Sequence, residues 1–143
     1  SATLLKALEN IYVNADVATV GPMIESLTDS TTNEKNLHIT PNAPAIIFGS
    51  TLLIKGDDPS VGIYFTKDEE GATPVKVSLI VRNTKSEIII QIPQLAEGQY
   101  WLSVTTQAGA NYGLVKDPRT YKFPILLTVG IGGGGDSESP DEI

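Results

Sequence analysis

Alternation of apolar and polar residues, broken at short intervals by turn formers, is the feature of this sequence that most constrains its fold. In GQYWLSVTTQ, Tyr100, Leu102 and Val104 fall on one side of an extended chain, and Trp101 falls on the other. Successive side chains of a β-strand point to opposite faces, so this pattern predicts a strand with one buried face. The same period in PVKVSLIVR, residues 74–82, predicts another single strand whose odd-numbered apolar residues share one face.

Six further runs have the composition of strands. They are PMIESLTD, APAIIFGS, STLLIKG, SVGIYFT, SEIIIQIP and TYKFPILLTV. In PMIESLTD, we expect Ile24, Ser26 and Thr28 on one face. Gly, Pro, Asn or Asp interrupts the runs about every 8–12 residues, which is typical of an antiparallel sandwich or barrel. No helical segment of about ten residues separates the runs, which argues against a parallel α/β sheet.

One motif narrows the all-β class further. LAEGQYWLSV has the spacing L-x-x-G-x-Y-x-L-x-V, which immunoglobulin-like sandwiches use where a tyrosine hydroxyl bonds back to the upstream backbone. Gly98 would form the turn, and the hydroxyl of Tyr100 would make this hydrogen bond. We therefore expect an immunoglobulin-like antiparallel β-sandwich of about seven strands with Greek-key connections.

The chain divides into three segments. Residues 1–20 are expected to be an arm or linker from a preceding domain that lies outside this chain, either as a short helix or as a loose arm that runs into a strand. Residues 21–129 form the sandwich. Residues 130–143, GIGGGGDSESPDEI, have little apolar surface to offset their ordering entropy, so we expect a disordered tail.

Composition excludes several kinds of chemistry. The 143 residues contain no cysteine and one histidine, which excludes disulfides, thiolate metal sites and a cysteine nucleophile, and disfavours a histidine metal cage. His38 has no adjacent carboxylate in the sequence, so we expect a surface or half-buried side chain. The glycine-rich GIGGGG lacks the lysine of a phosphate-binding loop. We expect neither an enzyme nor a cofactor.

Two acidic loops allow two interpretations. Asp57 and Asp58 precede a proline in GDDPSVG, and three more acidic residues lie in KDEEG, residues 67–71. Carboxylates so arranged could bind Ca²⁺, which takes six to eight oxygen ligands. They could equally form turns, in which aspartate bonds the backbone two residues on. The spacing does not fit an EF-hand loop, and we favour turns.

A surface for a ligand or protein partner is the remaining candidate site. If Tyr100 points inward, Trp101 lies on the outer face, where with Tyr64 and Tyr112 it could form an aromatic platform; a neighbouring loop could also cover it. Arg119 is the fourth residue of this candidate surface. It lies in LVKDPRTYKF, which we interpret as the entry to the last strand.

The charge of the chain disfavours DNA binding by the sandwich itself. The formal net charge is −7, and four of the 17 acidic residues lie in the last eight positions. The rest of the chain is nearly balanced, whereas binding to duplex DNA is driven by cationic side chains.

Three blocks carry a resemblance to a known family. LLIKGDDPSVGIYF, IIIQIPQLAEGQYWLSVTTQ and LVKDPRTYKFPILLTV together resemble DUF4469, an immunoglobulin-like domain of Bacteroidetes proteins, over about residues 20–130. TPNAPAIIFGS resembles a further family segment, with Asn42 where the family usually has glycine. Such proteins usually carry an HU-like (histone-like) DNA-binding domain before this domain, and this chain is too short to contain one.

The resemblance implies a function and leaves an alternative. It implies a non-catalytic accessory or interaction module of an HU-like DNA-binding protein, with protein partners, DNA contact only through the absent domain, and a cytoplasmic place at the nucleoid. The alternative is a cell-surface or secreted sandwich that binds carbohydrate or protein. The family names no catalytic residue.

Overall fold

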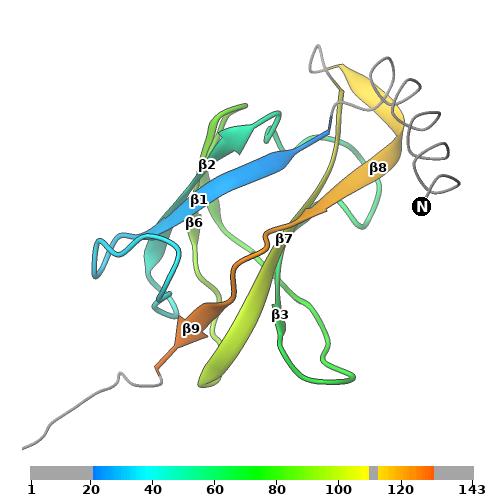
Figure 1. Ribbon diagram of the computed structural model, residues 1–143. Helices are drawn as coiled ribbons and strands as arrows, with labels where there is room; N and C mark the ends of the chain where they lie inside the picture. Colours follow the sequence, from blue (N-terminus) through cyan, green and yellow to red (C-terminus); the bar gives the residue numbers. More distant parts are fainter. Residues whose placement is uncertain (1–20, 110–112, 131–143) are drawn as a thin grey trace, which may run out of the picture.

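The computed structural model describes residues 21–109 and 113–130, which are all-β (Figure 1). The expected arm, residues 1–20, lies outside the described residues, as do residues 131–143 of the tail expected at 130–143. Tyr112 also lies outside them. The strands are β1 (Met23–Asp29), β2 (Pro44–Ser50), β3 (Gly62–Lys67), β4 (Val75–Lys76), β5 (Ile80–Asn83), β6 (Glu87–Gln91), β7 (Gly98–Ala108), β8 (Leu114–Lys122) and β9 (Leu127–Val129).

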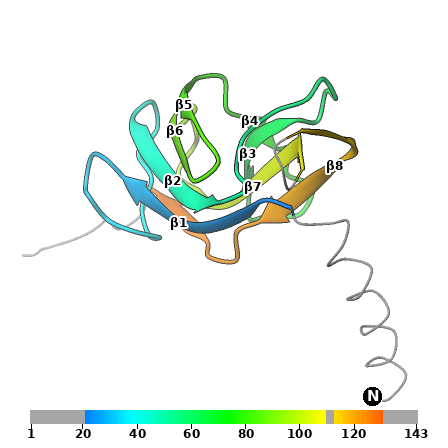
Figure 2. The ribbon, with the colours of Figure 1, turned by 90° about the horizontal axis from the view of Figure 1, so that it is seen from above.

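The strands form two antiparallel sheets. One has the order β1-β2-β6-β5; the other has the order β4-β3-β7-β8, with β9 also paired to β7. Seen from above, β2, β5 and β6 lie on one side of the molecule, and β3, β4 and β7 lie on the other (Figure 2). The first order matches the A-B-E-D sheet of an immunoglobulin domain, and β3-β7-β8 matches its C-F-G sheet. The predicted immunoglobulin-like sandwich is confirmed.

The core lies between the two sheets. Ile88 and Ile90 of β6 and Leu102 of β7 are fully buried, and their neighbours along each strand are only partly buried. Phe65 of β3 and Phe123, just after β8, add the largest fully buried side chains. Removal of such apolar surface from water is the dominant favourable term in folding.

Strand β1 does not keep the predicted alternation. The register with β2 shifts between Ile24 and Ser26, so one extra residue enters β1. Beyond this bulge the buried positions move to Leu27 and Asp29, and Thr28 turns partly outward. A bulge of one residue has this effect because side chains alternate with a period of two.

The prediction of a single strand at residues 74–82 is wrong. Strand β4 pairs with β3 in one sheet, and β5 pairs with β6 in the other. The chain crosses between the sheets in the three residues from Val77 to Leu79. Val77 is buried, whereas Leu79 and Val81 are 48% and 64% exposed, so the odd-numbered residues do not share one face.

STLLIKG is also not a strand. Leu52 is buried, but isolated backbone hydrogen bonds and hydrogen bonds to side chains take the place of a regular ladder in this segment. The side chain of Asn83 accepts a hydrogen bond from Ile54 N and donates one to Ile54 O, each 2.9 Å long. Lys55 N donates to Oγ1 of Thr106 at 3.0 Å.

The interpretation of LVKDPRTYKF as strand entry is wrong as well, because these residues form strand β8 itself. The strand ends at Lys122, before Pro124, and β9 is a separate strand. Proline cannot donate to a ladder, which explains the break.

The predicted hydrogen bond from the Tyr100 hydroxyl to the upstream backbone is present. Gly98 has φ of 151°, and Tyr100, 3% exposed, donates from its hydroxyl to the carbonyl of Ala96 at 2.7 Å. This bond closes the corner between β6 and β7, as in immunoglobulin-like domains.

We expect Tyr100→Phe to lower the free energy of unfolding by about 1–2 kcal/mol, because it leaves a part-buried carbonyl without its donor. Urea denaturation measures the change. Tyr64→Phe is the matched control: the Tyr64 hydroxyl also donates to a carbonyl four residues back, that of Ser60, but on the surface. Its loss should stay within about 0.5 kcal/mol, and equal losses would contradict a structural role of the corner.

Candidate functional site

The outer face of the β4-β3-β7-β8 sheet, the face turned away from the core, carries two of the four candidate residues, Trp101 and Tyr64. The register aligns Lys76, Tyr64, Ser103 and Lys122 in one row across its four strands. Residues paired in register share a face of the sheet. Trp101, paired with Thr66, lies on the same face one step along the strands.

Each aromatic ring on this face is covered by a lysine. The Nζ atom of Lys122 lies 4.3 Å from the ring centroid of Trp101, and that of Lys76 lies 5.9 Å from the ring centroid of Tyr64. Ammonium groups at these distances are attracted by the negative face of the ring. The face is therefore a cationic surface built on two aromatic rings, rather than a bare stacking platform.

The polar edges of both rings are also engaged. Trp101 Nε1 donates to Oδ1 of Asp68 at 3.1 Å, and the Tyr64 hydroxyl donates to Ser60 O at 2.7 Å. These bonds fix the rings against the sheet and join them to the two acidic loops.

The four candidate residues do not form one surface. Trp101 and Tyr64 share the outer face, and Tyr112 lies outside the described residues. Arg119 pairs with the buried Thr106, so it belongs to the opposite face of β8. There, the position that a Cβ atom of Gly21 would occupy lies 3.6 Å from Arg119 Cβ.

Sequence reasoning missed the two lysines. Lys76 and Lys122 are 46 positions apart in the chain, and only the pairing of both with the β3-β7 pair brings them into one row. The alternation within each strand was visible, but the register between strands was not.

The acidic loops form turns. Oδ1 of Asp58 accepts hydrogen bonds from Ser60 N at 2.9 Å and from Ser60 Oγ at 2.7 Å. These bonds favour the ionised carboxylate and hold the pKa of Asp58 below its usual value. In the second loop, Glu69 lies 3.8 Å from Lys67. Over the described residues, no three acidic or histidine side chains gather where they could hold a metal ion.

Gln107 connects the three blocks that carried the family resemblance. On either side of Gln107 in β7, Thr106 pairs with Arg119 of β8 and Ala108 pairs with Leu114. Residues 115–118 of β8 therefore bulge out opposite Gln107 alone. The side-chain Nε2 donates to the carbonyls of Val115 and Lys116 at 3.2 and 3.0 Å, and thereby satisfies acceptors at the bulge.

The same side chain also holds the GDDP loop. Its Oε1 accepts from the backbone N–H of Asp58 at 3.0 Å. Gly56, with φ of 129°, passes so close that an added Cβ would come within 2.2 Å of this oxygen. One structural junction therefore joins the motifs of the loop, of β7 and of β8. Pro118 lies in the bulge of β8, and a bulge on an edge strand tolerates proline.

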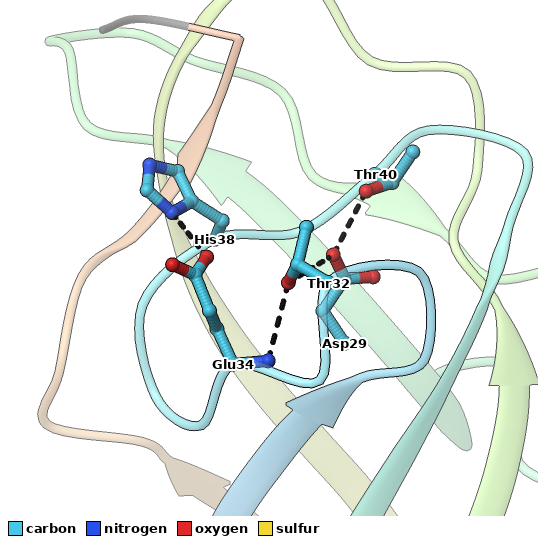
Figure 3. Close-up of polar contacts among 5 residues, drawn as sticks. All are labelled: Asp29, Thr32, Glu34, His38 and Thr40. Atoms are coloured by element: carbon cyan, nitrogen blue, oxygen red, sulfur yellow. Dashed lines mark hydrogen bonds and ion pairs between the residues drawn. The ribbon is translucent and has the colours of Figure 1, made fainter. Parts of the chain in front are cut away.

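A second polar cluster closes the loop between β1 and β2 (Figure 3). Asp29 is buried, and its Oδ2 accepts from the hydroxyls of Thr32 at 3.0 Å and Thr40 at 2.8 Å. His38 Nδ1 lies 2.6 Å from Oε1 of Glu34, four positions earlier in the chain, and the half-buried side chain expected for His38 is confirmed. Both side chains are about one-third exposed, which fits a surface pair rather than a catalytic one.

We expect Gln107→Ala to lower the free energy of unfolding by about 1–3 kcal/mol, because one N–H and two carbonyls lose their partner. Gln99→Ala is the control, since Gln99 is an exposed glutamine of the same strand, and it should change stability by at most about 0.5 kcal/mol. Thermal or urea denaturation measures both. Similar values for the two variants would show that the junction contributes nothing specific.

Ser60→Ala should raise the pKa of Asp58 toward its usual value, because it removes the hydroxyl donor, the largest cause of the lowered pKa. A carboxylate with a lowered folded-state pKa stabilises the fold above its unfolded pKa, and this contribution is lost as pH falls through the folded pKa. Carboxyl NMR titration follows Asp58 directly. Ser30→Ala serves as the control, and an unchanged titration in Ser60→Ala would refute the assignment.

Comparison with known proteins adds the wider context. The sequence model of DUF4469, a domain of unknown function with an immunoglobulin-like fold, matches residues 23–121. A crystal structure from Bacteroides vulgatus, of a protein described as a candidate bacterial DNA-binding protein, is 35% identical and superposes with a TM-score of 0.68. The match covers 75% of this chain and 46% of that one, so this chain spans less than half the length of that protein. No curated protein matches the sequence.

The match and the structure agree on the fold. The matched region begins with β1 and ends in β8, so it takes in both sheets and the Gln107 junction. The resemblance inferred from the three sequence blocks is confirmed. The chain belongs to the DUF4469 family of domains with an immunoglobulin-like fold.

Proposed function

We propose that this domain is a non-catalytic interaction module of a larger, HU-like DNA-binding protein whose DNA contacts reside in a preceding domain. The observation that carries the proposal is the partial match to the Bacteroides vulgatus protein, which is described as DNA-binding and of which this chain spans only 46%. The remainder of such a protein offers a place for the DNA-binding surface. In this setting the protein acts on DNA in the cytoplasm, at the nucleoid.

The charge of the sandwich supports this division of labour. Residues 21–130 contain 11 acidic and nine basic side chains. Affinity for duplex DNA comes mainly from cationic groups that displace counterions from phosphates. A domain with a slight excess of acidic residues is better suited to contacts with protein than to contacts with phosphate.

The roles of the family motifs support a non-catalytic module. GDDP forms a turn, Tyr100 locks a corner, and Gln107 joins the loop to the β8 bulge. Each motif stabilises the backbone, and none delivers a nucleophile or a proton-transfer pair to a shared cleft. In the described part of the chain, no helix is long and apolar enough to cross a membrane.

The alternative, a carbohydrate- or protein-binding sandwich at the cell surface, draws on Trp101 and Tyr64, which share an outer sheet face. Sugars bind aromatic rings through the ring face. Here a lysine ammonium lies over each ring, so a sugar would have to displace it. The lysines therefore favour the first proposal.

Fluorescence anisotropy with labelled duplex DNA tests the proposed function. At low salt we expect weak or no binding by the 143-residue chain and tight binding by a longer natural protein that contains it. The affinity of the longer protein should fall steeply with salt, as phosphate contacts require. Binding by the 143-residue chain as tight as that by the longer protein would contradict the proposal, as would failure of the longer protein to bind.

A further inference from the structure

We propose that the outer face of the β4-β3-β7-β8 sheet binds an acidic segment of the same chain, residues 136–142, through Lys76 and Lys122. This contact does not depend on the proposed function, because it concerns only charges within the chain. It would make the acidic segment an internal competitor for any other anionic partner of this face.

The first argument is the charge of the face. The row that crosses all four strands carries a lysine at each end, with Tyr64 and Ser103 between them. Both lysines are exposed, and within residues 21–109 and 113–130 neither forms an ion pair. The row thus presents two cations and no carboxylate, although the chain as a whole is acidic.

The side chains beside the row are also suited to carboxylates. The exposed Thr120 lies one step along the strands on the same face, and its hydroxyl is 2.7 Å from that of Thr105, which is buried. Thr66 pairs with Trp101 on the other side of the row. Hydroxyl groups can donate to a carboxylate that the lysines attract.

The second argument is the complementary composition of the segment. DSESPDE, residues 136–142, contains four acidic residues, and no lysine or arginine occurs after Lys122. Five residues, Ile131 to Gly135, separate it from the last described residue, Gly130. The occupant therefore has the opposite charge and is tethered to the same domain.

The third argument is reach. Val129 pairs with Gly98, so the described chain ends beside the first residue of β7, five residues before Ser103 in the row. Five strand residues rise about 17 Å. Asp136 is the sixth residue after Gly130 and can lie about 20 Å from it in an extended chain. The acidic segment can therefore reach the row.

The spacing within the segment also fits. Lys76 and Lys122 stand on strands that are three ladder steps apart, or about 14 Å at the usual distance between strands. Asp136 and Asp141 are five residues apart and can span about 17 Å. One segment can therefore place carboxylates at both ends of the row.

A spin label tests the contact directly in the full chain. The sequence has no cysteine, so Ser139→Cys gives a single attachment site for a nitroxide. At about 10 mM salt, where charges act over about 30 Å, we expect loss of NMR signal from the amides of Lys76, Ser103 and Lys122. Amides of β2 and β6 in the other sheet should keep their intensity. At about 1 M salt, where the screening length is about 3 Å, the loss should disappear.

Lysine variants supply the specificity control. Lys76→Gln combined with Lys122→Gln should abolish the signal loss on the outer face. Lys35→Gln removes an exposed lysine of the loop between β1 and β2 and should leave the loss unchanged. The amide signals of the buried Ile88 and Ile90 in the other sheet report independently whether each variant stays folded.

Three outcomes would overturn the proposal. The signal loss could fall elsewhere, could persist at high salt, or could survive the double lysine substitution. A third experiment adds a short single-stranded oligonucleotide to the unlabelled chain. If the oligonucleotide shifts the signals of the row equally in the chain with and without residues 136–143, the face is open to external polyanions and the internal contact is refuted.

Discussion

The hydrogen-bond ladders of β7 are the interaction on which the five-stranded sheet depends. Strands β3, β8 and β9 all pair with β7, while β4 reaches the sheet only through β3. The strand begins at the tyrosine corner, and near its end the side chain of Gln107 donates to carbonyls of β8 where the backbone ladder with that strand is interrupted. Both its buried face and its outer face follow from a single alternating sequence.

Much of this fold could be predicted from the sequence, because alternation and turn residues are local signals. Strand β7, with Tyr100 inward and Trp101 outward, follows directly from the period of two. The predictions fail where the alternation of a strand is visible in the sequence but its partner strand is not. Residues 75–83 alternate well, yet nothing in them reveals that β4 and β5 join different sheets. In β8, four residues bulge out opposite Gln107 of β7, and no local pattern in β8 predicts this bulge.

The candidate surface shows the same limit. Trp101 was correctly expected opposite Tyr100, since that relation lies within one strand. Arg119, by contrast, lies on the other face of β8 from Lys122, and the lysines that cover the rings come from strands far apart in the chain. The chemical character of the face, cationic rather than purely aromatic, thus emerges only from the register between strands.

The crossing from β4 to β5 bears on how the domain assembles. Val77 N donates to Ile63 O in one sheet, and two residues later Leu79 O accepts from Gln91 N in the other. One short stretch of backbone therefore belongs to both layers. Because this stretch bonds to both sheets, neither sheet can keep all of its hydrogen bonds while the other is unfolded. We therefore expect the sandwich to unfold as one cooperative unit, as small single domains usually do.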